Sequence, residues 1–238
     1  MARTYGKPSR FLWFNYKLSK IIATIYLLIL GAVLYFLFIE HFNYLRSVAG
    51  LIAVLIVGLP LILVNLFFYN KFNREANDYY HGRKGEGAIW YELMELPNDY
   101  HVFQDLIIDG RGNIDFVVLG PTGLFTIEVK SHTGDVGYKN GELTLNNQPA
   151  EKDFLNQAMA ETLNTHDYLK QKLNEDIFVN PVIVFSNPQA HVHFMLEPVR
   201  NVFVVQKRFL RKLILSRPRI LSFDRITLIE NELKNLVN

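Results

Sequence analysis

The chain has 238 residues and no cysteine, which excludes disulfides, cysteine-ligated zinc and thiol nucleophiles. Its formal net charge is +2, but six Lys/Arg and a single acid fall in residues 1–70, so the rest of the chain is slightly acidic. A basic overall balance is therefore no argument for nucleic-acid binding. Within the rest, the segment from Arg200 to Arg225 carries eight basic residues and only Asp224. It predicts either contact with a phosphate backbone or an ordinary solvated helix.

Two long uncharged stretches near the N-terminus predict a pair of transmembrane helices. Residues 21–39 are nineteen residues without a charge. As a helix they would span about 28 Å, close to the ~30 Å hydrocarbon core of a bilayer. Residues 48–69 form a second such stretch, and only eight residues join the two. The pair is therefore expected to form an antiparallel hairpin.

The charges that flank the two stretches predict their orientation. Five Lys/Arg and no acid precede the first span, Lys71 and Arg74 follow the second, and the joining loop has one Arg. By the positive-inside rule, both termini and the soluble domain are cytoplasmic, in a multi-pass protein of the plasma (inner) membrane. A cleaved signal peptide would be shorter and would lack the second span. We divide the chain into a membrane-anchoring hairpin, 1–75, and a soluble domain, 76–238.

Helices and strands alternate in the predicted soluble domain. After a polar linker, residues 73–82, apolar residues from Ile89 to Leu96 recur at helical spacing and predict a helix that begins near Arg83 and ends before Pro97. This order of elements predicts an α/β fold, a mixed sheet flanked by helices. The other predicted elements are strands at 101–109, 114–120 and 124–130, a hairpin at 135–147, a helix at 151–173, strands at 177–186 and 201–206, and helices near 207–215 and 222–237.

Charged residues interrupt the two apolar strands at 114–130. Side chains alternate along a strand, so Glu128 and Lys130 point the same way. The short turn pairs the strands antiparallel, which brings Asp115 to the same end of the hairpin. Two carboxylates and a nearby backbone carbonyl suit Mg²⁺, and a lysine can orient an attacking water, so the set suits phosphodiester hydrolysis. A turn residue and an exposed strand end are the alternative, and spacing alone leaves both open.

A further acid, Glu86, projects from the apolar face of its predicted helix, three residues before Ile89 and four before Trp90. A carboxylate that faces a core is costly unless it is paired or bound to a metal. The alternative is a favourable interaction with the helix dipole in the first turn.

Two segments resemble the nuclease-related domain (NERD) family: "RKGEGAIWYELMELPNDYHVFQDLIID" and "GNIDFVVLGPTGLFTIEVKSHTGDV". That family is similar to the PD-(D/E)xK nuclease superfamily, which has a restriction-endonuclease-like fold. The chain departs from the pattern at two positions. Ile114 stands where the superfamily motif has proline, and Glu161 stands where many relatives carry tyrosine.

The resemblance implies roles for the individual residues. Asp115 and Glu128, with the Val129 backbone carbonyl, would hold the metal, and Lys130 would serve the attacking water. Glu86 would support the metal or orient the site, and Gln157 would help at the phosphate.

These expectations combine into a membrane-anchored, divalent-metal-dependent nuclease. Its cofactor would be Mg²⁺ or Mn²⁺, and its substrate DNA rather than RNA. The alternative is a catalytically inactive, membrane-tethered module that binds nucleic acid or acts as a scaffold. Homo-oligomers could also form through the transmembrane hairpin.

Overall fold

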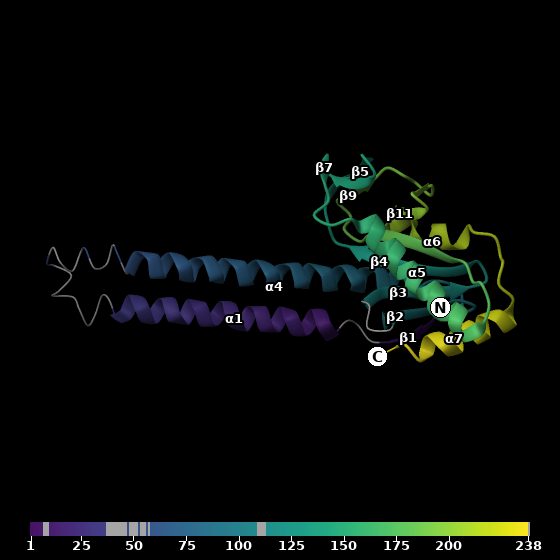
Figure 1. Ribbon diagram of the computed structural model, residues 1–238, viewed down its shortest axis with the longest axis horizontal. Coiled ribbons are helices and arrows are strands. Elements are labelled where there is room, and N and C mark those ends of the chain that lie inside the picture. Colours follow the sequence, from purple (N-terminus) through teal and green to yellow (C-terminus); the bar gives the residue numbers. More distant parts are fainter. Residues whose placement is uncertain are drawn as a thin grey trace. The chain divides into compact units, whose positions relative to one another are not determined.

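The computed structural model describes residues 1–6, 10–36, 47, 52, 56, 58–108 and 113–237 (Figure 1). The chain divides into two compact units. The helical unit is Arg10–His81, and the α/β unit combines Met1–Ser9 with Gly82–Asn238. Helix α4, Leu59–Met94, contributes residues to both units.

The helical unit consists of α1, Arg10–Tyr35, packed antiparallel against the first part of α4. The contacts run in opposite directions along the two helices. The Tyr16 ring meets that of Tyr80, Lys20 Nζ donates to Asn73 Oδ1 at 2.8 Å, and the Tyr26 ring stacks on Phe68 with centroids 5.2 Å apart.

One helix of the described part of the chain, Trp13–Tyr35, is long and apolar enough to cross a membrane, with a mean hydropathy of 2.0. It overlaps the first predicted span, residues 21–39. The second predicted span, residues 48–69, lies partly outside the described residues, and its last part opens α4.

The predicted start of a helix near Arg83 is wrong. Helix α4 runs without interruption from Leu59 to Met94, through the segment 73–82 that we expected to be a linker. That segment contains no proline and a single glycine, Gly82, so nothing in it breaks a helix. Its polarity reflects exposure to solvent and not a loop.

The α/β unit is built on a seven-stranded mixed sheet, in the order β1-β2-β3-β4-β8-β11-β10, with helices packed against it. This confirms the predicted mixed sheet flanked by helices. A second sheet has the order β7-β6-β5-β9. The strands are β1 Arg3–Tyr5, β2 His101–Ile107, β3 Asn113–Gly120, β4 Gly123–Lys130, β5 Gly134–Lys139, β6 Glu142–Leu145, β7 Gln148–Pro149, β8 Val179–Phe185, β9 Ala190–Val192, β10 Pro198–Val199 and β11 Val202–Gln206, and the helices are α5 Phe154–Leu173, α6 Lys207–Leu215 and α7 Phe223–Lys234.

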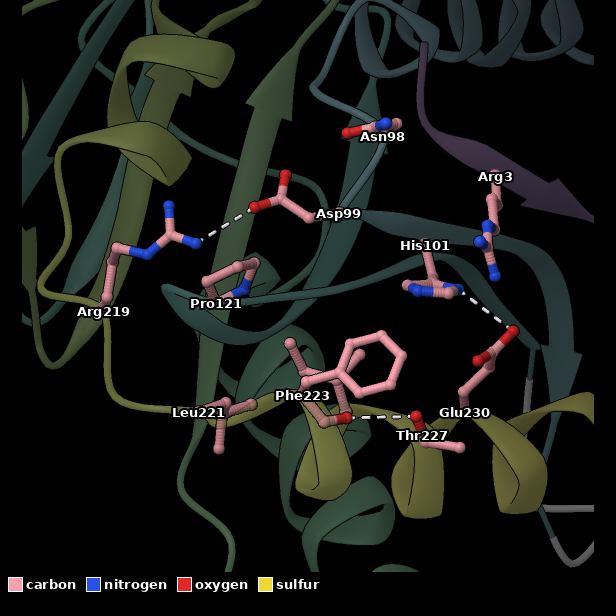
Figure 2. A pocket seen from close by; sticks show the side chains of 11 residues that line it. Arg3, Asn98, Asp99, His101, Pro121, Arg219, Leu221, Phe223, Thr227 and Glu230 are labelled. Atoms are coloured by element: carbon pink, nitrogen blue, oxygen red, sulfur yellow. Dashed lines mark hydrogen bonds and ion pairs between the residues drawn. The ribbon is translucent and has the colours of Figure 1, made fainter.

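Strand β1 is an addition that the sequence does not predict. It pairs in parallel with β2, with Arg3 beside His101. Its Tyr5 hydroxyl donates to Glu230 of α7 at 2.5 Å, and Glu230 also lies 3.1 Å from His101 Nδ1 (Figure 2). Lys234 Nζ is 2.7 Å from the same Glu230 oxygen. The first strand of the chain is therefore tied to its last helix.

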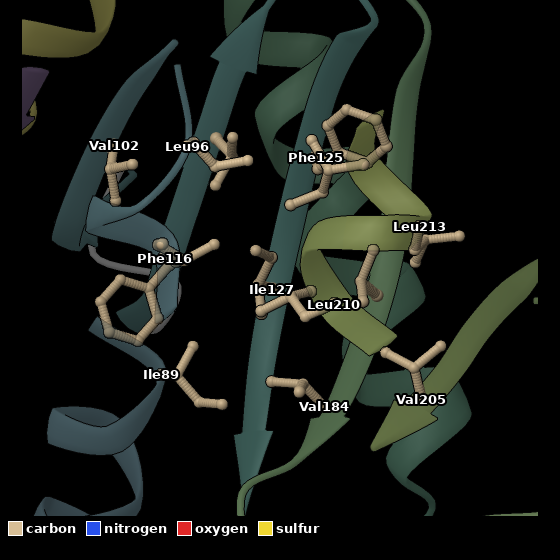
Figure 3. Close-up of a cluster of buried hydrophobic side chains, with 14 of the residues drawn as sticks. Ile89, Leu96, Val102, Phe116, Phe125, Ile127, Val184, Val205, Leu210 and Leu213 are labelled. Carbon is tan, nitrogen blue, oxygen red and sulfur yellow. The ribbon is translucent and has the colours of Figure 1, made fainter. Parts of the chain in front are cut away.

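The two faces of the large sheet carry different helices. Phe116, Ile127 and Val184 point to one face, where they pack with Ile89 of α4 and Leu210 of α6 (Figure 3). The opposite face packs against buried residues of α5 and α7. Because side chains alternate along β4, successive residues point alternately toward the face that packs on α4 and the face that packs on α5. The end of β4 is thus accessible to side chains from helices on both faces.

Candidate active site

The acidic residues of β3 and β4 lie side by side at one end of their hairpin. Phe116 pairs with Ile127, so Asp115 and Glu128 stand opposite each other at the next position of the same register. The backbone N–H of Val129 donates to Asp115 Oδ2 at 2.8 Å. Asp115 is therefore attached to β4 directly beside Glu128.

Lys130 lies at the centre of a compact hydrogen-bond network. Its Nζ donates to Glu128 Oε1 at 2.6 Å and to Gln157 Oε1 at 3.0 Å. Gln157 Nε2 in turn donates to Glu128 Oε1 at 2.7 Å and to Glu161 Oε1 at 3.0 Å. The Lys130 ammonium also lies 4.3 Å from the centroid of the Phe154 ring, within cation–π range. Helix α5 thus supplies three of the groups around this lysine.

Glu86 reaches the site from α4 because the preceding residue is glycine. A Cβ on Gly85 would lie 2.6 Å from Ser186 Oγ, which is too close. Ser186 could move away only by breaking its hydrogen bonds to the end of β4. Its N–H and its hydroxyl both donate to the Lys130 carbonyl, at 2.9 and 3.2 Å. The absence of a side chain at Gly85 therefore lets α4 approach the ends of β4 and β8.

Burial and mutual repulsion shape the electrostatics of these acids. Burial, with repulsion from Asp105 and Glu128, raises the pKa of Glu86 to about 8. Burial, followed by the charges of Glu128 and Glu86, raises the pKa of Asp115 well above its usual range. The same causes, burial and then Glu128, raise the pKa of Glu161 to about 8. Glu128 repels all three of these buried carboxyl groups, and a bound cation would favour their charged forms.

Two further acids at the site, Glu161 and Asp105, were not among the predicted site residues. Glu161 lies four residues after Gln157, on the same face of α5, and this spacing is a signal that the sequence offers. Asp105 stands opposite Asp115 in the register of β2 and β3, between the pairs Gln104–Phe116 and Leu106–Ile114. Its φ of 62° is unusual for a residue in a strand and has no signature in the sequence.

The chemistry of this donor set fits a hard divalent cation, since all the donors are carboxylate or carbonyl oxygens. Glu86 is 9% exposed and makes no hydrogen bond or ion pair that the described residues supply. In the described part of the chain, however, no three His, Asp or Glu side chains are gathered closely enough to hold a metal ion. Glu128 instead accepts from Lys130 and Gln157, and Asp115 accepts from Val129.

The basic segment Arg200–Arg225 is largely engaged elsewhere. Arg211 pairs with Glu92 of α4 and with Glu95, which directly follows that helix, both at 2.6 Å, and Arg219 pairs with Asp99 at 3.1 Å. Arg217 lies over the Phe203 ring, and Arg225 pairs with Glu175. Three of the eight cations of the segment, Arg211, Arg219 and Arg225, thus pair with acids of the same domain, which favours a structural role for these three over phosphate contact.

A cavity of about 320 Å³ lies at the other end of the β3–β4 hairpin, where Pro121 forms part of the turn (Figure 2). Its acids already have partners: Asp99 pairs with Arg219, and Glu230 with His101. A second cavity, of about 680 Å³, is lined by α5, β8 and neighbouring loops. Neither is lined by Glu86, Asp115, Glu128 or Lys130, so the hydrogen-bonded acidic cluster remains the candidate site.

Comparison with known proteins identifies the segment that carries this cluster. Residues 81–186 match the family model of NERD, the nuclease-related domain. No curated protein and no solved structure matched the chain. The matched segment runs from α4 to the end of β8 and includes every predicted site residue as well as Asp105 and Glu161. The chain therefore contains a nuclease-related domain.

Proposed function

We propose that this nuclease-related domain is a metal-dependent nuclease that hydrolyses phosphodiester bonds, with DNA as its first substrate and a restriction-endonuclease-like fold. The observation that carries the proposal is the position of Lys130. Its ammonium donates hydrogen bonds to Glu128 and Gln157, and the neighbouring residue Val129 donates its N–H to Asp115. A lysine beside carboxylates that can hold a divalent metal suits the hydrolysis of a phosphodiester.

Each residue has a chemical role in this proposal. Lys130 orients the attacking water and stabilises the negative charge that develops on the phosphate oxygens. Asp115, Glu128 and the Val129 carbonyl would hold Mg²⁺ or Mn²⁺, with Glu86 in support. Such an ion supplies positive charge at the phosphate and makes a bound water more acidic.

The alternative is a catalytically inactive module that binds nucleic acid or acts as a scaffold. One observation favours the inactive module. Glu128 is paired with Lys130, and no three carboxylates of the described residues lie close enough together to bind a metal ion. The intact set of Asp115, Glu128 and Lys130 favours catalysis. A cleavage assay separates the two.

We also propose that the helical unit anchors the domain in the inner membrane as a hairpin, with both termini cytoplasmic. The parallel pairing of β1 with β2 supports it. Strand β1 precedes α1, and β2 follows α4, yet both belong to one sheet and must lie on the same side of a membrane. If α1 crosses the bilayer, the chain must cross back before residue 82, which agrees with the second span predicted at 48–69.

The function is tested by incubating the full-length protein, purified in detergent, with plasmid DNA, single-stranded DNA and RNA, each with Mg²⁺ or Mn²⁺. We expect cleavage that EDTA abolishes. Lys130→Ala and Asp115→Asn should each lower the rate at least about a hundredfold, as losses of transition-state stabilisation typically do. Lys139→Ala, at an exposed lysine of β5, is the matched control and should keep the wild-type rate.

Cleavage that persists unchanged in Lys130→Ala and Asp115→Asn would contradict the proposed site. Nucleic-acid binding without cleavage under either metal would instead identify the inactive module. RNA cleaved faster than DNA would reverse the proposed substrate preference.

A further inference from the structure

We propose that Glu161 is a positioning residue: it fixes the orientation of the Gln157 amide, so that the amide oxygen faces Lys130. The inference deepens the proposed nuclease function and rests on it.

The Gln157 amide has a donor end and an acceptor end, and each has a defined partner. Its oxygen accepts from Lys130 Nζ at 3.0 Å. Its nitrogen donates to Glu128 Oε1 at 2.7 Å and to Glu161 Oε1 at 3.0 Å. Both hydrogens of the NH₂ group are therefore used, and the side chain is hydrogen-bonded at both ends.

A rotation of the amide by 180° would reverse these interactions. The NH₂ group would then face the Lys130 ammonium, which is also a donor, while the amide oxygen would face two carboxyl groups. The lysine would lose an acceptor, and Glu128 and Glu161 would each lose a donor. The two glutamates together therefore select one of the two amide orientations.

Of the two carboxyl groups that accept hydrogen bonds from the Gln157 amide nitrogen, Glu161 has fewer other partners than Glu128. Glu128 Oε1 is shared between Lys130 and Gln157, and in the proposed function Glu128 also serves the metal. The Glu161 carboxyl accepts from Gln157, and its second oxygen, Oε2, is buried without a hydrogen-bond partner in the described part of the chain. Glu161 can thus hold the amide when Glu128 is otherwise engaged.

The helix that carries both residues is rigidly placed. Gln157 and Glu161 lie four residues apart on α5 and so face the same direction. One residue further on, Thr162 is buried and forms a 2.5 Å hydrogen bond with Thr126 of β4. The Glu161 carboxyl is therefore held at a fixed distance from the strand that bears Lys130.

Lysine has a flexible side chain with four rotatable carbons, so its precision depends on its partners. Without Glu161 the Gln157 amide could rotate, and Lys130 would lose one of its two hydrogen-bond acceptors. Losing one hydrogen bond to a charged group corresponds to roughly a tenfold change in an equilibrium or a rate. We expect the loss in the chemical step and not in substrate binding.

Two substitutions distinguish positioning from a direct role of the carboxylate charge. Glu161→Gln keeps an oxygen that can accept from Gln157, whereas Glu161→Ala removes it. In the full-length protein we expect Glu161→Ala to lower kcat about tenfold with KM within about twofold, because one hydrogen bond is lost. Glu161→Gln should keep at least about a third of the wild-type kcat on this argument. Gln171→Ala, at an exposed position of the same helix, is the control.

If Glu161→Gln loses as much activity as Glu161→Ala, the charge of Glu161 matters and positioning is excluded. An unchanged kcat in Glu161→Ala would equally overturn the proposal.

A second readout does not depend on nuclease activity. Lys130 is 11% exposed and hydrogen-bonded, so an amine-acylating reagent should modify it slowly, as followed by mass spectrometry of its peptide. Glu161→Ala should raise this rate about threefold or more, in line with loss of one hydrogen bond. Glu161→Gln should not, and exposed Lys139 serves as an internal reference in each sample.

The two readouts separate the two proposals. Faster labelling of Lys130 in Glu161→Ala, with no cleavage by the wild type, would overturn the nuclease function and retain the positioning role. Equal labelling in the wild type and Glu161→Ala would overturn the positioning role whether or not the protein cleaves nucleic acid.

Discussion

At the scale of a single residue, the buried carboxyl group of Glu86 lowers the stability of the folded domain. Its side chain is buried, and the repulsion from Asp105 and Glu128 outweighs the attraction of Arg83. Burial and this repulsion raise its pKa to about 8, against an ordinary value of 4.5. The rest of the domain must stabilise the fold against this cost, as is common where function and stability compete.

The raised pKa predicts how stability depends on pH. Below pH 4.5 Glu86 is protonated in both the folded and the unfolded chain, and it costs no stability. As the pH rises toward 8 the unfolded chain ionises first, so stability is lost. We expect Glu86→Gln to raise the free energy of unfolding by about 1–2 kcal/mol at pH 8, and by much less at pH 4. Urea unfolding of both proteins at the two pH values measures this, and an equal effect at both would contradict it.

The alternation of side chains predicted which residues of the hairpin share an end, because Asp115, Glu128 and Lys130 are close in sequence and joined by a short turn. Glu161 was less visible. It lies thirty-one residues beyond Lys130, and its contact with Gln157 and the site depends on where α5 packs. Asp105 depends on the register of β2 against β3 and on a left-handed backbone, neither of which a residue pattern specifies.

At the scale of elements, the close approach of α4 to the ends of β4 and β8 depends on one glycine. Gly85 and Gly87 lie two residues apart on the same helix, but their surroundings differ. A Cβ at Gly85 would meet Ser186 Oγ at 2.6 Å, whereas a Cβ at Gly87 would meet no atom within 4 Å. Alanine substitutions at Gly85 and Gly87 therefore distinguish the effect of helix propensity on stability from the effect of packing.

Gly87→Ala should stabilise the protein by about 0.5–1 kcal/mol, since alanine favours the helix. Gly85→Ala has the same gain in propensity but must displace Ser186, and overpacking of this kind typically costs about 1–3 kcal/mol. We expect Gly85→Ala to be less stable than Gly87→Ala by at least about 1 kcal/mol, measured by urea unfolding. It should also slow nucleic-acid cleavage, because Glu86 moves with the helix. Equal stability of the two variants would show that the contact with Ser186 is unimportant.

The elements that periodicity predicted well are those with long apolar patterns, such as β3, β4, α5 and β8. The start of α4 was predicted wrongly because a polar exposed helix and a polar linker have the same composition. Strand β1 was missed because three residues, Arg3–Tyr5, carry no measurable alternation, and its partner β2 lies far along the chain. Residue patterns therefore do not predict the pairing of short strands that lie far apart in the sequence.

At the scale of the whole molecule, helix α1 exposes a large apolar surface. Only 11% of the apolar window of α1 is buried within the protein, and Leu28 of α1 is 68% exposed. Exposed apolar residues over so much of a helix favour a lipid environment.

Membrane insertion is tested with a charge near the middle of α1. We expect Leu28→Arg to lower the share of protein that stays with membranes after an alkaline carbonate wash severalfold, since arginine at the centre of a membrane helix costs about 2.5–3.5 kcal/mol. Leu228→Arg places the same charge at an exposed leucine of α7 and should leave that share unchanged. Equal retention of both variants would show that α1 lies outside the bilayer.

The position of β1 also affects the order in which the protein can fold during synthesis. Arg3–Tyr5 are synthesised before β2 and Glu230, with which they pair, and these follow about a hundred and more than two hundred residues later. At about 5–20 residues per second, the first strand waits at least several seconds for its partner. The helical unit is made during that interval. The domain therefore folds around a strand that was synthesised before the rest of its sheet, and the contact between Tyr5 and Glu230 forms only after α7 has been made.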